Sequence, residues 1–288
     1  MVQGQDFFFS FFTSLHSSLK DRSRSKHSIQ MLLFDPSFIF LVPTLLIPLF
    51  ANGDATTKTL TFMIPTPEQG LAYLNNKAII AAFAFYVLAQ LFTLGSGRST
   101  KTANWFLLNG AIIHVAMDGL TGGYHAIPLM DASYRQLDNR FNEDRKTGAS
   151  EDAWAAAYLV VTLELFVMAP MCFVTYFACM KKKSWRQEMV LLTGFIQLLG
   201  TIMFVFPEFV TGCKNLSPFG LEGCIERFTS VPSGSTLEYH GLFFLFAVGA
   251  NLVWIFVPLK LMVNAWNENL AAKTGTFKST TKTKAKIY

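Results

Sequence analysis

Two ionisable side chains stand inside an apolar stretch of the sequence. His114 and Asp118 occur in "IIHVAMDGLTGGYH" (112–125), and neither the preceding "ANWFLLNGAI" nor the following "LTGGYHAIPL" carries a charged group besides them. A spacing of four residues places both on one face of a helix, one turn apart. Because apolar surroundings disfavour an imidazole and a carboxylate alike, their joint burial indicates a function.

Other polar side chains recur at depth in the apolar blocks. A second carboxyl group, Glu164, lies within block 155–180. Two carboxyl groups and an imidazole in a dry cavity can hold different protonation states, so one donates a proton while another accepts it. A tryptophan face and an amide stabilise a carbocation. We therefore predict alkene protonation, with catalytic residues His114, Asp118 and Glu164, and substrate-binding residues Asn251, Trp254, Gln197 and Glu208.

Each of these polar groups also has a structural interpretation. Glu208 lies near the end of its block and would then be hydrated at the interface. Gln197 and Asn251 would bond one helix to another. His114 and Asp118 would form a buried structural ion pair, but an unpaired carboxylate such as Glu164 is costly at depth. No metal-ligand spacing, glycine-rich phosphate loop or nucleophilic serine constellation occurs in the sequence, so we expect no metal and no cofactor.

The elements that position these residues are membrane-length helices. Of the 288 residues, 51% are hydrophobic and only 15% are charged, whereas soluble domains carry about a quarter charged residues. The apolar residues form blocks near the length that spans a bilayer. We predict an all-α polytopic membrane protein, a helical bundle of five transmembrane helices. These come from blocks 78–95, 103–120, 155–180, 189–210 and 239–263.

An earlier block, 31–51, is interrupted by Pro36, Pro43 and Pro48, and its length also suits an interfacial or re-entrant segment. Lysine and arginine cluster at 20–26, 97–101, 181–186 and 278–286. Basic loops mark the cytoplasmic face, and six spans put all four clusters on that face. We therefore predict that 31–51 is an extra transmembrane helix and that both termini are cytosolic.

The remaining loops, 52–77, 125–153 and 211–238, would face the lumen. Two cysteines close a short segment of the last one, so we predict a Cys213–Cys224 disulfide. The net charge of +5 is attributed to loop and tail lysines facing anionic lipid, and we expect no nucleic-acid partner. Lys284 and Lys286 resemble a retrieval signal of the endoplasmic reticulum membrane, although a solvated lysine tail is an equal alternative.

From about Ala78 to Leu270 the chain resembles the emopamil-binding protein family, also called EXPERA, whose known members include sterol Δ8–Δ7 isomerases. The matching motifs are "IIHVAMDG", "VVTLELFVMAP", "IQLLGTIMFVFPE" and "NLVWIFVP". The resemblance implies a membrane domain at 78–270, preceded by a cytosolic segment (1–30) and the extra helix (31–51), and followed by a basic cytosolic tail (271–288). It also implies that His114 and Asp118 handle the proton, with Glu164 as partner acid.

Two positions depart from the family pattern. Asp118 stands where the family usually has glutamate, and Val161 stands where the isomerases have their second glutamate, three residues before Glu164. A helix rises 1.5 Å per residue, so Glu164 is displaced along the pocket by about 4.5 Å. We expect an isomerase or cyclase acting on a sterol or another polycyclic isoprenoid, a terpenoid or meroterpenoid. The alternative is a non-catalytic protein that binds sterols or lipids. Membrane lipid is the expected surrounding, and a homodimer is left open.

Overall fold

The computed structural model describes residues 51–54, 59–62, 66–93, 100–142, 151–216 and 251–274. All of them belong to one compact unit, Leu45–Tyr288. The stretch 31–50, where we predict an extra transmembrane helix, lies outside the described residues, as do Lys284 and Lys286 of the tail.

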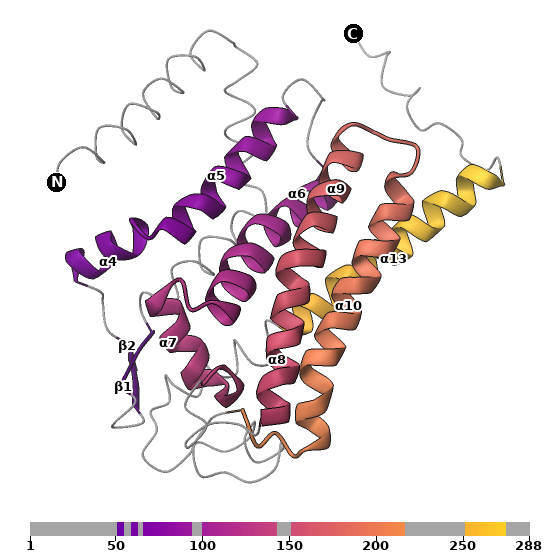
Figure 1. Cartoon of the computed structure of the whole chain (residues 1–288). Helices are drawn as coiled ribbons and strands as arrows, with labels where there is room; N and C mark the ends of the chain where they lie inside the picture. Colours follow the sequence, from indigo (N-terminus) through magenta and orange to yellow (C-terminus); the bar gives the residue numbers. More distant parts are fainter. Residues whose placement is uncertain are drawn as a thin grey trace, which may run out of the picture. The chain divides into compact units, whose positions relative to one another are not determined.

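The described part of the chain is helical, apart from one short hairpin, and the predicted all-α class is confirmed (Figure 1). The hairpin pairs β1 (Ala51–Asp54) with β2 (Thr59–Phe62). The helices are α4 (Pro67–Leu74), α5 (Lys77–Phe92), α6 (Lys101–Leu108), η1 (Asn109–Gly123), α7 (Pro128–Leu137), η2 (Asn139–Phe141), α8 (Glu151–Leu163), η3 (Glu164–Met168), α9 (Ala169–Met180), α10 (Arg186–Val210) and α13 (Asn251–Lys273).

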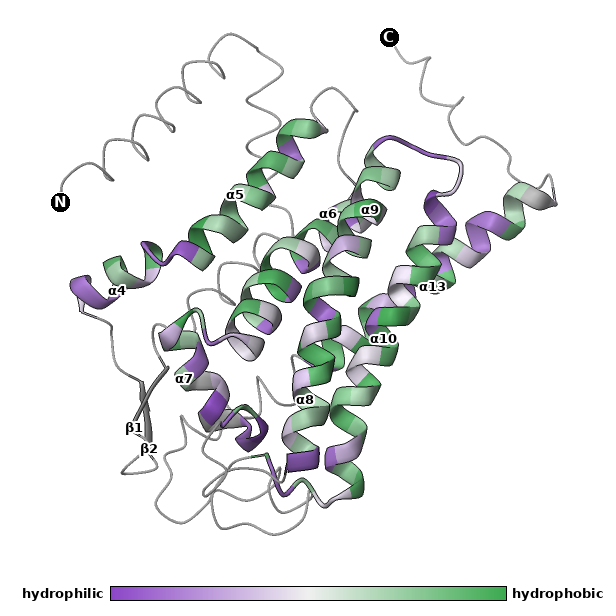
Figure 2. Ribbon diagram, in the orientation of Figure 1, coloured by the Kyte–Doolittle hydropathy of each residue, from purple (hydrophilic) through white to green (hydrophobic). Residues whose placement is uncertain are grey.

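Membrane-spanning length is clearest in two of these helices. The continuous helix Glu151–Met180 and the helix Arg186–Val210 are long and apolar enough to cross a bilayer, and α4 with α5 would add a third span bent by 55°. Large hydrophobic side chains point outward from them, among them Phe92, Phe166 and Phe206. Figure 2 shows hydrophilic residues gathered instead in α7 and in the turn between α9 and α10. A surface this apolar fits lipid, and the chain is a membrane protein.

Two of the regions that connect the predicted spans contain regular structure. Segment 52–77 holds the hairpin and α4, and segment 125–153 holds α7 and the 3₁₀ turn η2. Helix α4 begins at a capping box, in which Thr66 and Gln69 exchange side-chain-to-backbone hydrogen bonds. Such short, polar helices carry no apolar block, so hydropathy does not reveal them.

Both segments that bear the predicted acids are π-helical. Helix η1 carries His114 and Asp118, and η3 begins at Glu164. π-helical stretches are rare and occur frequently at functional sites. A Cβ added at Gly119 would lie 2.7 Å from the Cβ of Leu165 in η3. Gly119 therefore allows the two acid-bearing segments to approach closely.

Cys213 is disulfide-bonded, as predicted for it. Cys172 and Cys179 are free thiols, which leaves Cys224, outside the described residues, as the predicted partner. Cys213 follows α10 with a φ of 56°, directly after Gly212 at 75°. These two left-handed residues turn the chain back toward α10, and the disulfide holds that turn.

Candidate active site

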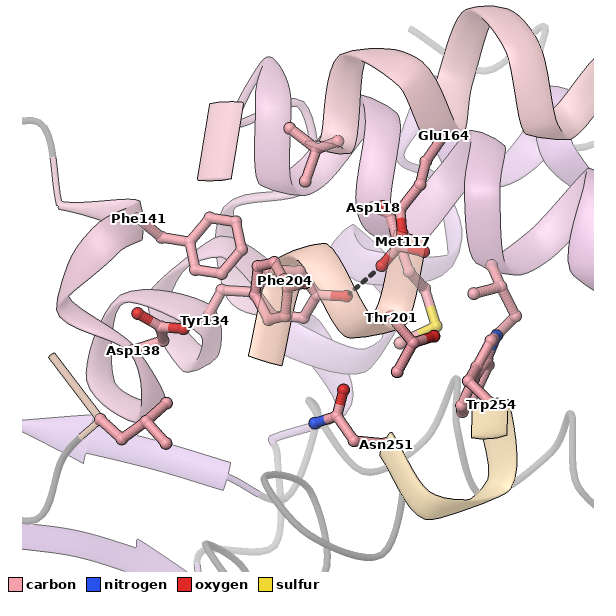
Figure 3. A pocket seen from close by; sticks show the side chains of 13 residues that line it. Met117, Asp118, Tyr134, Asp138, Phe141, Glu164, Thr201, Phe204, Asn251 and Trp254 are labelled. Carbon is pink, nitrogen blue, oxygen red and sulfur yellow. Dashed lines mark hydrogen bonds between the residues drawn. The ribbon is translucent and has the colours of Figure 1, made fainter. Parts of the chain in front are cut away.

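A mostly apolar cavity of about 180 Å³ lies where η1, α7, α8, η3, α10 and α13 meet. Four of the predicted residues line it: Asp118, Glu164, Asn251 and Trp254. Figure 3 shows Asp118 and Glu164 side by side, with Asn251 and Trp254 across the cavity from them. The helices thus bring together side chains separated by more than 100 positions of the sequence.

The predicted acid–imidazole cluster is formed in space. One ring nitrogen of His114 and one oxygen from each of Asp118 and Glu164 lie within 4.8 Å of one another. His114 Nδ1 lies 3.5 Å from Asp118 Oδ2. His114 itself is 1% exposed and does not line the cavity. It therefore lies behind Asp118, and of these three groups only the two carboxyl groups line the cavity.

A hydrogen-bond relay behind His114 fixes its tautomer. The indole N–H of Trp105 donates to Gln197 Oε1 over 3.4 Å. An indole N–H can only donate, so the amide nitrogen of Gln197 must face the other way, toward His114 Nε2 at 3.2 Å. Nε2 of His114 then accepts, and the proton of the neutral ring is on Nδ1. That N–H points to the Asp118 side.

The same tautomer bears on metal binding. His114, Asp118 and Glu164 have the residue types and the proximity of a three-ligand metal site. A metal ion needs a lone pair on the ring nitrogen that faces it. On His114 the inward nitrogen carries the proton and the outward one accepts from Gln197. The cluster therefore fits proton transfer, and a metal would require Gln197 to turn.

Tyr134 is a site residue that the sequence analysis did not predict. It lies on α7, and its hydroxyl group donates to Asp118 Oδ1 over 3.2 Å, the bond drawn in Figure 3. Removal from water raises the pKa of the Tyr134 phenol well above its usual value, and the charges of Asp118 and Glu164 raise it further. The phenol therefore stays protonated and acts as a donor to Asp118.

Trp254 is held in place by an amide beneath it. Its indole N–H donates to Asn109 Oδ1 over 2.9 Å, and the Asn109 amide nitrogen donates to the Trp105 carbonyl over 2.8 Å. The Trp105 and Trp254 rings lie 6.1 Å apart. Asn109 is fully buried, so the orientation of Trp254 in the cavity is set before any ligand enters.

Two predicted substrate-binding residues do not line the cavity. The Gln197 amide contacts His114 Nε2 from the side away from the cavity, and this contact joins α10 to η1. Glu208 is buried and accepts from the backbone and side chain of Asn215. Its Oε1 also lies 3.5 Å from Arg140 Nε. Glu208 is thus neither hydrated nor available to a ligand in the cavity, and it instead fastens the chain that follows α10.

A buried charged cluster of Arg140, Asp138 and Glu208 lies at the end of the cavity lined by Asp138 and Leu216. Arg140 donates to Asp138 through Nε and Nη2 and to the Phe204 carbonyl through Nη1. Asp138 forms an isolated bridge with Leu216, and both Asp138 and Leu216 line the cavity. The segment held by the Cys213 disulfide is therefore part of the cavity wall.

A comparison with models of known protein families identifies the family that this part of the chain matches. Residues 134–265 match the family model EBP, described as EXPERA (EXPanded EBP superfamily). Residues 134–265 belong to the EXPERA superfamily. Among curated proteins, none matches the chain.

The EXPERA match includes Tyr134, Glu164, Asn251 and Trp254, and it begins after Asp118. Asp118 lies outside the EXPERA match, and the Tyr134 hydrogen bond connects it to that region. Val161, which stands where the isomerases have a glutamate, also lines the cavity. Its apolar side chain leaves Asp118 and Glu164 as the facing carboxyl pair.

Proposed function

We propose that this protein is a membrane-embedded isomerase or cyclase that protonates an alkene of a sterol or another polycyclic isoprenoid. The observation that carries the proposal is the pairing of Asp118 and Glu164 in a mostly apolar cavity. Among the described residues, the Tyr134 hydroxyl donates to Asp118 and His114 Nδ1 lies 3.5 Å from its other oxygen, whereas no side chain donates a hydrogen bond to Glu164. Neighbouring carboxylates repel and share one proton. The donors favour negative charge on Asp118, so the shared proton resides on Glu164.

The reaction then needs two proton transfers. The Glu164 proton adds to one alkene carbon, and the π electrons form the new C–H bond, which leaves a cation on the neighbouring carbon. Asp118 removes a proton from a carbon next to the cation, and those C–H electrons form the shifted double bond. The proton returns from Asp118 to Glu164, which lies within reach. If a second alkene reaches the cation first, a ring closes before the deprotonation.

His114 and Tyr134 position Asp118 in this scheme. The Tyr134 hydroxyl donates to Oδ1 of Asp118, and His114 Nδ1 lies 3.5 Å from Oδ2 without forming a hydrogen bond. This refines the sequence-based prediction, in which His114 itself handles the proton. Because the Gln197 amide donates to Nε2, the ring proton is on Nδ1 and its N–H faces Asp118, which supports the negative charge there.

We expect the face of Trp254 to stabilise the cation. Replacing Trp254 by phenylalanine should lower turnover by less than about tenfold, because a phenyl face still attracts a cation, while Trp254→Ala should cost about 10–100-fold. Turnover is measured from the isomerised product by mass spectrometry. Trp266, which is 63% exposed on α13, supplies the matched control pair. Equal losses in the phenylalanine and alanine variants would contradict cation stabilisation by the ring.

Complementation tests the proposed activity. Cells that lack Δ8–Δ7 sterol isomerase receive the chain or its Glu164→Gln variant, and their sterols are profiled by mass spectrometry. A sterol isomerase restores Δ7-sterols with the wild-type chain only. No restoration, combined with no conversion of polycyclic terpenoids supplied to microsomes, would overturn the catalytic proposal.

A second candidate function is sterol or lipid binding without catalysis. The observation that favours it is Val161, because the resemblance to the isomerases implies a glutamate there. A binding protein would tolerate Glu164→Gln as it tolerates other isosteric changes.

For location we propose the endoplasmic reticulum membrane in a multi-pass topology, on the strength of Lys284 and Lys286. Mutation of both lysines should then redistribute a tagged chain away from that membrane.

A further inference from the structure

A second cavity, of about 320 Å³, adjoins the first one. It lies between the end of η1, the turn η2 and the first turns of α8. Phe141 lines both cavities, so its ring is their common wall. A Cβ added at Gly122 would lie 3.0 Å from the Phe141 ring, so the ring rests on a position that has no side chain.

The two cavities follow one another along α8. Ala157 lines the second cavity, and Val161, one turn further, lines the first. The distance from Trp154, at the start of the second cavity, to Glu164 is about 15 Å at 1.5 Å per residue. The first cavity alone is smaller than the roughly 300–1,000 Å³ of typical ligand sites, whereas the two together fall within that range.

The chemistry of the second cavity differs from that of the first. Its walls include the stacked rings of Trp154 and Tyr158, 5.2 Å apart, and two groups that can donate, His125 and Arg140. Tryptophan and tyrosine are typical of the membrane–water interface. The second cavity therefore lies at the interfacial end of the helix, and the acids lie deeper.

Arg140 indicates which ligand group would fit there. Its hydrogen bonds use three of the five guanidinium N–H groups, those that reach Asp138 and the Phe204 carbonyl. Its charge is already balanced by Asp138 and by Glu208. His125 likewise contacts Asp131 over 2.6 Å. A guanidinium whose charge is compensated, as in Arg140, suits a neutral oxygen better than a phosphate or a carboxylate.

We propose that the second cavity binds the oxygenated end of the substrate, a ring hydroxyl or ring ketone, while the alkene lies in the first cavity. The inference rests on the proposed function and adds to it the orientation and polarity of the substrate. The molecule lies along α8, with its oxygen at the membrane interface and its hydrocarbon skeleton toward Glu164. Phe141 must swing aside for one molecule to occupy both cavities.

Equilibrium binding to the full chain in phosphatidylcholine nanodiscs tests the subsite. The probes are a Δ8-sterol with a free 3-hydroxyl group and the same sterol without that group. The wild-type chain should bind the hydroxylated probe roughly tenfold more tightly, the size of one hydrogen bond to a charged group. The larger side chain of Ala157→Leu fills the second cavity. The variant should bind the hydroxylated probe only as tightly as the deoxy probe, and its affinity for the deoxy probe should stay within twofold of the wild-type value.

Ala156→Leu is the matched control, because Ala156 is exposed on the same turn and should change neither affinity. Gly123→Ala is a milder second variant, since its Cβ would meet only Val161 at an ordinary 3.5 Å, and it should reduce the preference in the same direction. Equal affinity of both probes for the wild-type chain, or an equal loss of both in Ala157→Leu, overturns the subsite alone. Failure of both probes to bind overturns the subsite and the sterol form of the proposed function together.

Discussion

Replacing Glu164 by glutamine is expected to lower turnover about a thousandfold while leaving substrate affinity nearly unchanged. The amide has the shape of the acid but carries no transferable proton, and general acid catalysis contributes about 10²–10⁴-fold. The rate of the double-bond shift is followed by mass spectrometry on a Δ8-sterol, and affinity by binding of the same probe. Asp118→Asn should be similarly slow, because it removes the acceptor.

Glu188→Gln is the control for this change, since Glu188 is an exposed residue of α10 and should keep the full rate. Retention of more than a tenth of the rate in Glu164→Gln would show that Glu164 is not the proton donor. A loss of affinity parallel to the loss of rate would instead favour the binding function.

His114 offers the second large effect, and the two substitutions at this position should differ. His114→Ala removes the N–H that faces Asp118 and is expected to cost about a hundredfold or more in turnover. His114→Asn places an amide N–H at the position of Nδ1, the same number of bonds from the backbone. It should therefore retain activity within about tenfold of the wild-type chain. Rates of both variants are compared on the same substrate, with membrane-extracted folded protein quantified in parallel.

Equal losses in His114→Ala and His114→Asn would contradict the positioning role, because an N–H restored at the position of Nδ1 would then fail to support Asp118. Such a result would favour proton transfer by the imidazole ring itself. A nitrogen-15 spectrum of histidine-labelled protein provides an independent check. The Trp105–Gln197–His114 relay predicts a neutral ring with its proton on Nδ1. A signal from the opposite tautomer would remove the basis of this assignment.

The sequence alone predicts which helices carry the site but not how they are shaped. His114, Asp118 and Glu164 are visible because ionisable residues are rare in apolar blocks, and the structure brings these three together. The π-helical form of η1 and η3 is not visible, because hydropathy and spacing carry no signal for a wider turn. Gly119, which permits the close approach of these segments, looks like any other glycine of an apolar stretch.

The residues missed by sequence analysis lie mostly where the chain is polar. Tyr134 occurs in a segment taken as a loop, and its bond to Asp118 depends on α7 folding against η1. Asn109 contacts Trp254 across 145 positions of the sequence, a pairing that spacing along the chain does not predict. Gln197 and Glu208 were predicted to bind substrate because they are polar groups within apolar blocks. The sequence does not distinguish a side chain that lines a cavity from one that packs behind its wall.

Turnover in heavy water tests the proton-transfer mechanism most directly. The Glu164 proton exchanges with heavy water before the substrate binds, so each product molecule of the first turnover should carry one deuteron on a carbon that was part of the alkene. The position is read by mass spectrometry and by deuterium resonance, and Glu164→Gln should form no labelled product. Product formed by the wild-type chain without deuterium at that carbon would contradict alkene protonation, and Asp118 and His114 would then be a buried structural pair.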